Sequence, residues 1–152
     1  MMNLIEDTIT PHFKLSEFAN NEDGGKMLLN QDVLQFIQML EVFRIWYNRP
    51  MSVTSGYRTK VFNEKVGGDV NSYHLKALAV DFRLPSEYYK WTRERQNEFL
   101  NNIKEKWYRI CDDKILPSTG QKICGSVLFE PTWVHLDVRT GKRYFDDRRG
   151  GK

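Results

Sequence analysis

A short segment with two different faces constrains the fold of this chain more than any other feature. Between Leu78 and Leu84, large apolar residues alternate with a set that contains Asp81. Because successive side chains of a β-strand point to opposite faces, the apolar set should lie in a core and Asp81 on the other face of the sheet. The apolar set is Leu78, Val80, Phe82 and Leu84. Such a strand requires a sheet that packs one face against a core and leaves the other face available for a polar site.

A second segment near the C-terminus repeats this pattern. In residues 133–139, the apolar residues Val134, Leu136 and Val138 alternate with a set that contains His135 and Asp137. These two polar side chains should therefore share one face of a strand. If the two strands are neighbours, His74, Asp81 and His135 can converge on one point. Two imidazoles and one carboxylate form a three-ligand zinc site with an open fourth position, which is the arrangement of catalytic rather than structural zinc.

The residues around the first of these histidines carry a family resemblance. The run Ser72-x-His74 to Ala79-x-Asp81, with the later His135, resembles the zinc D-Ala-D-Ala carboxypeptidases and L-Ala-D-Glu endopeptidases that cut peptidoglycan stem peptides. Bacteriophage endolysins are well represented among these enzymes, and the zinc-bearing domain of hedgehog proteins shares their fold. The similarity covers most of the chain, in the family's order, and includes two earlier motifs. These motifs are Phe13-x-Leu15-Ser16-Glu17-Phe18 and Ser55-Gly56-Tyr57-Arg58.

The resemblance implies roles for the side chains in these motifs. The two histidines and the aspartate would bind Zn²⁺. Arg58 would contact a substrate carboxylate or the developing oxyanion, where a fixed cation is most useful. Ser72 would orient His74 or contact the substrate, and Trp133 would contact the substrate beside His135.

Several of these residues also have an ordinary alternative. A single histidine such as His74 is more often a partly exposed side chain than a ligand. Arg58 could form only a salt bridge, and Ser72 could only form a turn. The third histidine of the chain, His12, is expected at the surface before the first helix.

The group that carries the proton is the least determined part of the site. The chain departs from the family's pattern in two places. Ala77 stands where the family usually has glycine. Residues 132–134 contain neither the carboxylate nor the second histidine that several relatives carry just before the last zinc ligand, which is His135 here. Hydrolysis needs a proton carrier. Asp137, on the face of His135, is the first candidate; its alternative is a partner of that histidine or a surface salt bridge. Glu130 is the second candidate, and its alternative is a solvated turn residue.

Composition narrows the class of protein. The 152 residues suffice for one domain with a core of its own. A net charge of +3, with no strongly basic face, argues against nucleic acid as a partner. Cys111 and Cys124 are expected as reduced thiols. We also expect a monomer that does not bind membranes. The N-terminus lacks a signal-peptide pattern, so a wall-cutting enzyme of this kind would reach its substrate after release by a phage or within a virion.

The remaining patterns predict an α+β fold with helices packed on one face of a small, mostly antiparallel sheet, as in the hedgehog and D-Ala-D-Ala peptidase fold. The core helix should bury a broad apolar face that includes Ile45 and Trp46. The expected helices are a short one capped by Ser16, a core helix from Asn30 to about Asn48, a short one over Thr59–Val66, and a long one capped by Ser86. Strands are expected over 51–56, 78–84, 123–129 and 133–139.

The sequence therefore predicts a single zinc peptidase domain over residues 1–141, followed by a basic and flexible tail over residues 142–152. Its predicted activity is hydrolysis of an amide bond in peptidoglycan stem peptides, as in a phage or prophage lysin. The alternative is a non-catalytic, zinc-containing domain that uses the same cleft for recognition. Arg58 and Asp137 favour the enzyme, whereas the missing carboxylate before His135 favours the binding domain.

Overall fold

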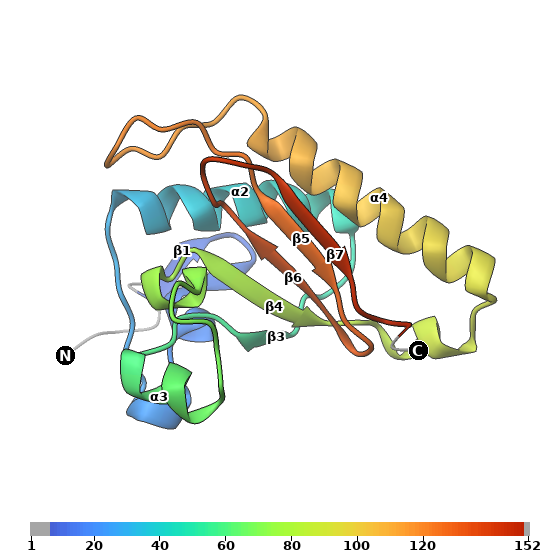
Figure 1. Cartoon of the computed structure of the whole chain (residues 1–152), viewed down its shortest axis with the longest axis horizontal. Helices are drawn as coiled ribbons and strands as arrows, with labels where there is room; N and C mark the ends of the chain where they lie inside the picture. Colours follow the sequence, from blue (N-terminus) through green and yellow to red (C-terminus); the bar gives the residue numbers. More distant parts are fainter. Residues whose placement is uncertain (1–6, 151–152) are drawn as a thin grey trace.

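The computed structural model describes residues 7–150, which form a five-stranded sheet with two long helices on one face (Figure 1). The helices are α2 (Gln31–Tyr47) and α4 (Arg93–Cys111). A small sheet, β1 (Thr8–Thr10) with β2 (Phe13–Lys14), precedes them. The short helix α3 is Lys60–Lys65, and the 3-10 helices are Leu15–Phe18, Asn21–Asp23, Tyr73–Lys76 and Ser86–Lys90. The predicted α+β class is confirmed. No helix within residues 7–150 is long and apolar enough to cross a membrane.

The large sheet has the strand order β3-β4-β6-β5-β7. Its strands are β3 (Val53–Ser55), β4 (Ala79–Arg83), β5 (Ser126–Phe129), β6 (Trp133–Asp137) and β7 (Tyr144–Asp147). All neighbours are antiparallel except β5 and β7. The two strands with the strongest alternation, β4 and β6, are neighbours, and Asp81 lies opposite His135.

Local sequence determines where α2 begins and ends. The side chain of Asn30 accepts a hydrogen bond from the backbone N–H of Val33 at 2.9 Å, and Asn48 ends the helix in the left-handed region with φ 54°. Both bounds agree with the prediction. The predicted apolar face is wrong at Ile45 and Trp46, which are exposed because other positions complete the stripe that faces the core. Those positions include Phe36, Ile37, Leu40, Phe43 and Tyr47.

Two predicted helix starts are displaced. The long helix expected from Ser86 is divided: Ser86–Lys90 is a 3-10 helix, and α4 begins only after Thr92, whose side chain caps its first turn. Near the N-terminus, Ser16 lies inside a 3-10 helix instead of capping it. Its hydroxyl donates a hydrogen bond to the carboxylate of Asp7.

Aromatic side chains join both helices to the sheet. Trp107 of α4 meets Phe36 and Phe43 of α2 edge-on, with ring centroids 6.1 and 6.2 Å apart. Phe43 also meets Phe82 of β4 at 5.9 Å. All four rings are buried, and full burial of a large apolar side chain contributes about 2 kcal/mol to stability. This core holds the helix-covered face of β4, so Asp81 lies on the opposite face.

Residues 142–150 are not the flexible tail predicted from their charges. Tyr144–Asp147 form β7, which pairs in parallel with β5. The ring of Phe145 meets that of the buried Phe129 with centroids 5.0 Å apart, and Arg149 is hydrogen-bonded to an asparagine of α4. This segment is therefore part of the sheet.

A chain that stops after Gly141 tests the placement of β7. Its loss would expose Phe129 and the edge of β5, so the midpoint of thermal unfolding should fall by roughly 5 °C or more. Circular dichroism melting of the complete and shortened chains measures the difference. Phe145→Ala, which removes one ring and keeps the strand, should give a smaller fall. Equal midpoints for the complete and shortened chains would contradict a structural role for β7.

Candidate metal centre

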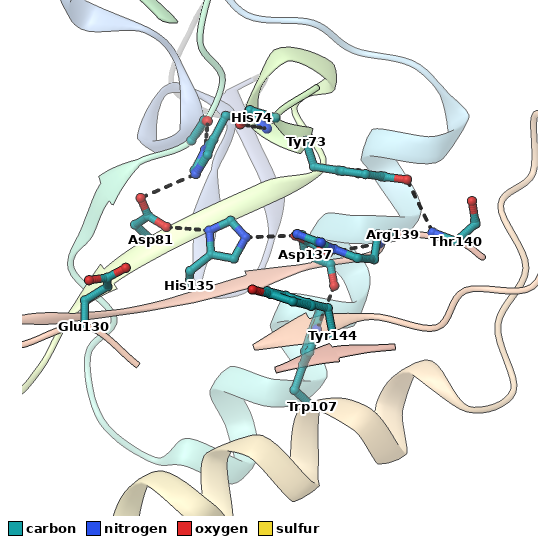
Figure 2. Close-up of polar contacts among 12 residues, drawn as sticks. Tyr73, His74, Asp81, Trp107, Glu130, His135, Asp137, Arg139, Thr140 and Tyr144 are labelled. Carbon is teal, nitrogen blue, oxygen red and sulfur yellow. Dashed lines mark hydrogen bonds and ion pairs between the residues drawn. The ribbon is translucent and has the colours of Figure 1, made fainter. Parts of the chain in front are cut away.

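The three predicted ligands lie together on the face of the sheet that the long helices leave open (Figure 2). β4 supplies Asp81, and β6 supplies His135 directly opposite. His74 comes from the 3-10 helix Tyr73–Lys76, which precedes β4. One ligand atom from each residue lies within 4.8 Å of the other two.

His74 is held by the backbone around it. The hydroxyl of Ser72 accepts a hydrogen bond from the N–H of His74 at 3.2 Å. The ring Nδ1 lies 2.6 Å from the carbonyl oxygen of Gly56, so this nitrogen carries the proton and Nε2 is left to face Asp81, 3.4 Å from its Oδ2. Gly56 has no room for a side chain, because a Cβ there would lie 2.6 Å from the carbonyl oxygen of Phe18.

Ala77, at the position where the resemblance leads one to expect glycine, ends this 3-10 helix. Ala77 is buried and adopts a left-handed conformation with φ 58°. For an L-residue other than glycine, this conformation costs about 1 kcal/mol or more. The substitution therefore changes backbone strain and adds no group to the site.

His135 is held between two carboxylates. Its Nδ1 lies 2.8 Å from Oδ1 of Asp81, and its Nε2 lies 2.8 Å from Oδ2 of Asp137. Histidines that bind metals usually donate their second ring N–H to a carboxylate or a carbonyl, which fixes the ring and strengthens the ligand. In His135 the second ring nitrogen faces the carboxylate of Asp137, and in His74 it faces the backbone carbonyl of Gly56. With nitrogen and oxygen ligands of the kind that zinc prefers, the residues present fit a zinc ion.

Burial and hydrogen bonding act in opposite directions on these groups. Burial raises the pKa of Asp81, but its interactions with His135 and His74 outweigh burial and hold this pKa well below its usual value. The pKa of Asp137 is also lowered: burial raises it, and the bonds from His135 and Arg139 prevail. Burial lowers the pKa of His135, whereas its bonds to the two carboxylates raise it to about 9. Both aspartates are therefore ionised at neutral pH, as a metal ligand and its partner must be.

Asp137 has no free carboxylate oxygen. Its Oδ2 accepts hydrogen bonds from His135 Nε2 and Arg139 Nη2, and its Oδ1 accepts them from the backbone N–H and the Nε of Arg139. The side chain has no solvent exposure. A proton carrier must reach the substrate or a water molecule. The geometry therefore favours the alternative role of Asp137, as the partner that orients His135.

The cluster lines a cleft of about 800 Å³. Arg58, Ser72, Glu130 and Trp133 all line the same cleft, so the structure brings every predicted site residue to one place. Figure 2 shows Glu130 on the Asp81 side of the cluster, with no direct contact to the ligands. Its carboxylate forms an ion pair with Arg148 at 3.0 Å and keeps some exposure to solvent.

The guanidinium of Arg58 is held mainly by neutral acceptors. Its Nε donates to the hydroxyl of Ser55 at 3.3 Å, and its Nη1 donates to Oδ1 of Asn63 at 3.2 Å. The nearest carboxylate is that of Asp81, 3.7 Å from Nη2. Burial lowers the pKa of Arg58, and Asp81 acts in the opposite direction. A cation so loosely paired can bind an anionic group that enters the cleft.

Sequence reasoning gave no role to three residues that support the site. Alternation in residues 133–139 puts Arg139 on the same face as His135 and Asp137, so a signal for it is present in the sequence. Gly56 and Asn63 act through single hydrogen bonds to side chains distant in sequence or across a turn, which no pattern of residue types reveals. The remaining histidine, His12, lies outside the cluster and pairs with Glu41.

Comparison with known families supports this site. The family model described as Peptidase M15 matches residues 11–107, which is more than half of the chain and contains Arg58, His74 and Asp81. His135 lies beyond the match, so its place in the cluster rests on the structure. No curated protein matches the chain.

The ligand set predicts the metal content. The purified protein should hold about one zinc ion per chain, and a variant with both His74→Ala and His135→Ala should hold almost none. Elemental analysis after dialysis gives the content. Because a metal that binds only the folded state adds stability, chelation should lower the unfolding midpoint of the wild type and leave that of the double variant unchanged. Equal zinc in both proteins would contradict the assignment.

Proposed function

Because the chain belongs to the peptidase M15 family, we propose that it is a zinc peptidase that hydrolyses an amide bond in peptidoglycan stem peptides. The observation that carries this proposal is the convergence of His74, Asp81 and His135 in a cleft that also presents Arg58 and Glu130. The bond is of the D-Ala-D-Ala or L-Ala-D-Glu type, and the protein acts as a phage or prophage lysin. These finer proposals rest on the resemblance of its motifs.

Zinc held by the three ligands would supply Lewis acidity toward the scissile carbonyl and lower the pKa of the attacking water. The protein supplies the positions of the other groups. Arg58 binds a substrate carboxylate or the oxyanion that forms during attack, since within residues 7–150 its charge is opposed only by Asp81, at 3.7 Å. Trp133 and Ser72 form parts of the wall along which the peptide lies.

Glu130 is the carboxylate best placed to carry the proton. It begins the turn between β5 and β6 and keeps some exposure to solvent, whereas Asp137 lines the same cleft but is shielded and fully hydrogen-bonded. In hydrolysis it would take a proton from the attacking water and pass it to the leaving amine. Its pair with Arg148 holds the carboxylate at the edge of the cleft. We therefore assign the proton transfer to Glu130 and the orientation of His135 to Asp137.

A non-catalytic binding domain is the second candidate. The observation in its favour is that residues 132–134, immediately before His135, contain no acidic side chain. Glu130 is also tied to a cation in the structure. In such a domain the same cleft would hold a peptide without cleaving it.

Digestion of purified peptidoglycan, with mass spectrometry of the soluble products, tests the proposal. The zinc-loaded protein should release peptide fragments whose new ends identify the bond, and a chelator should stop the release. The double variant without ligands serves as the control. Zinc-loaded protein that binds peptidoglycan and releases nothing would support the binding domain instead.

Exchange of one carboxylate at a time separates the two proton-carrier assignments. Glu130→Gln should retain zinc and lower the rate of peptide release by roughly two to four orders of magnitude, since the base is lost and the shape is kept. Glu87→Gln is a matched control, because it breaks another exposed glutamate–arginine pair whose residues do not line the cleft. Its rate should equal that of the wild type. A fully active Glu130→Gln variant beside an inactive, zinc-loaded Asp137→Asn variant would reverse the assignment.

A further inference from the structure

Arg139 grips the carboxylate that orients His135. Its Nη2 lies 2.6 Å from Oδ2 of Asp137, and its Nε lies 3.0 Å from Oδ1 and 3.2 Å from Oδ2. The backbone N–H of the same residue adds a bond to Oδ1 at 3.0 Å. A planar guanidinium that meets both oxygens of a carboxylate fixes the plane of that carboxylate as well as its position.

Two tyrosine rings hold the guanidinium of Arg139 in turn. Its central carbon lies 5.1 Å from the ring centroid of Tyr144 and 5.7 Å from that of Tyr73. Tyr73 is fixed through its hydroxyl, which accepts a hydrogen bond from the N–H of Thr140 (Figure 2). Tyr144 belongs to β7, which is paired with β5. Cation–π contacts of this kind favour one position of the guanidinium.

We propose that Arg139 is a positioning residue of the metal centre: clamped between Tyr73 and Tyr144, it fixes Asp137, and Asp137 fixes the ring of His135 so that Nδ1 faces the metal. This rests on the zinc site of the proposed function. Through Tyr144, this role connects the metal ligands to β7, a strand within the segment that the sequence predicted to be a flexible tail.

The direction in which zinc affinity changes when Arg139 is replaced distinguishes a positioning role from a purely electrostatic one. A cation near a zinc site repels the ion, so loss of the Arg139 charge would by itself strengthen zinc binding. Loss of orientation weakens it, because the imidazole ring is no longer held in the ligating position. Changes in groups that orient a ligand typically lower metal affinity by about 10- to 100-fold.

Competition with a chromogenic chelator, using zinc alone as the probe, measures this effect. Arg139→Gln should raise the zinc dissociation constant by about 10-fold or more. Arg143→Gln is the matched control: Arg143 lines the same cleft, but it stacks on Tyr108 and pairs with Asp112. The variant loses the same charge, but the side chain of Arg143 pairs with Asp112 and not with Asp137, so zinc should bind as tightly as in the wild type or more tightly.

A second pair of variants tests the clamp without altering a charge. Tyr144→Phe keeps the ring and should keep wild-type zinc affinity, whereas Tyr144→Leu removes it and should weaken zinc binding about two- to fivefold. With cobalt as the probe, the visible absorption bands report ligand geometry. The bands should shift in Arg139→Gln and Tyr144→Leu and stay unchanged in Tyr144→Phe.

Three results would overturn the proposal. These are zinc affinity in Arg139→Gln equal to or above that of the wild type, an equal loss in Arg143→Gln, and equal affinities in the two Tyr144 variants. If Arg139→Gln does not fold, as judged by circular dichroism, the exposed Tyr144 pair decides alone. Failure of the wild type to release peptides would contradict the peptidase proposal and leave these zinc measurements intact.

Discussion

The pairing of Asp81 with His135 across β4 and β6 is the contact on which the site depends. It exists only in one register of the two strands, because a slip by one residue turns every side chain of a strand to the other face. The register is held from the opposite side of the sheet, where Phe82 contacts the aromatic rings of α2. The same alternation thus places the hydrophobic core on the helix-covered face of the sheet and the charged cluster on the opposite face.

The charged cluster is stable because each buried group has a partner. An isolated ion in such a place would be strongly destabilising, whereas paired ions with satisfied hydrogen bonds are tolerated. Asp81 is bonded to His135 and lies close to His74 and Arg58, and Asp137 is bonded to His135 and Arg139. The network therefore serves the fold and the chemistry together. A change at one member leaves another member buried without its counter-charge.

Strand alternation was sufficient to predict the face on which Asp81 and His135 lie. That β4 and β6 are neighbours was only a condition of the predicted site, and alternation could not place His74, which lies in a 3-10 helix. It could not predict what each side chain contacts on that face. Asp137 illustrates this: its place beside His135 was predicted, but its hydrogen bonds to the guanidinium of Arg139 were not. Glu130 had no periodic signal because it lies in a turn.

The errors in the fold have similar causes. Ser86 and Thr92 are both suitable helix caps, and only the three-dimensional packing selects Thr92 for α4. Residues 142–150 look like a solvated tail because Asp146 and Asp147 interrupt a run of basic residues there. In the structure those charges pair with one another within the segment, as Arg148 does with Asp146 and Arg149 with Asp147. Local neutralisation of this kind allows a charged strand to join a sheet.

The parallel pairing of β5 with β7 determines the order in which the centre can be assembled. The chain runs through β5, returns antiparallel as β6, and then crosses to the far edge of β5. β7 therefore has no partner until β5 is in place. His74 and Asp81 emerge from the ribosome well before His135, and the Tyr144 side of the clamp emerges later still. The support of His135 through Asp137 and Arg139 is therefore complete only once β7 has joined β5.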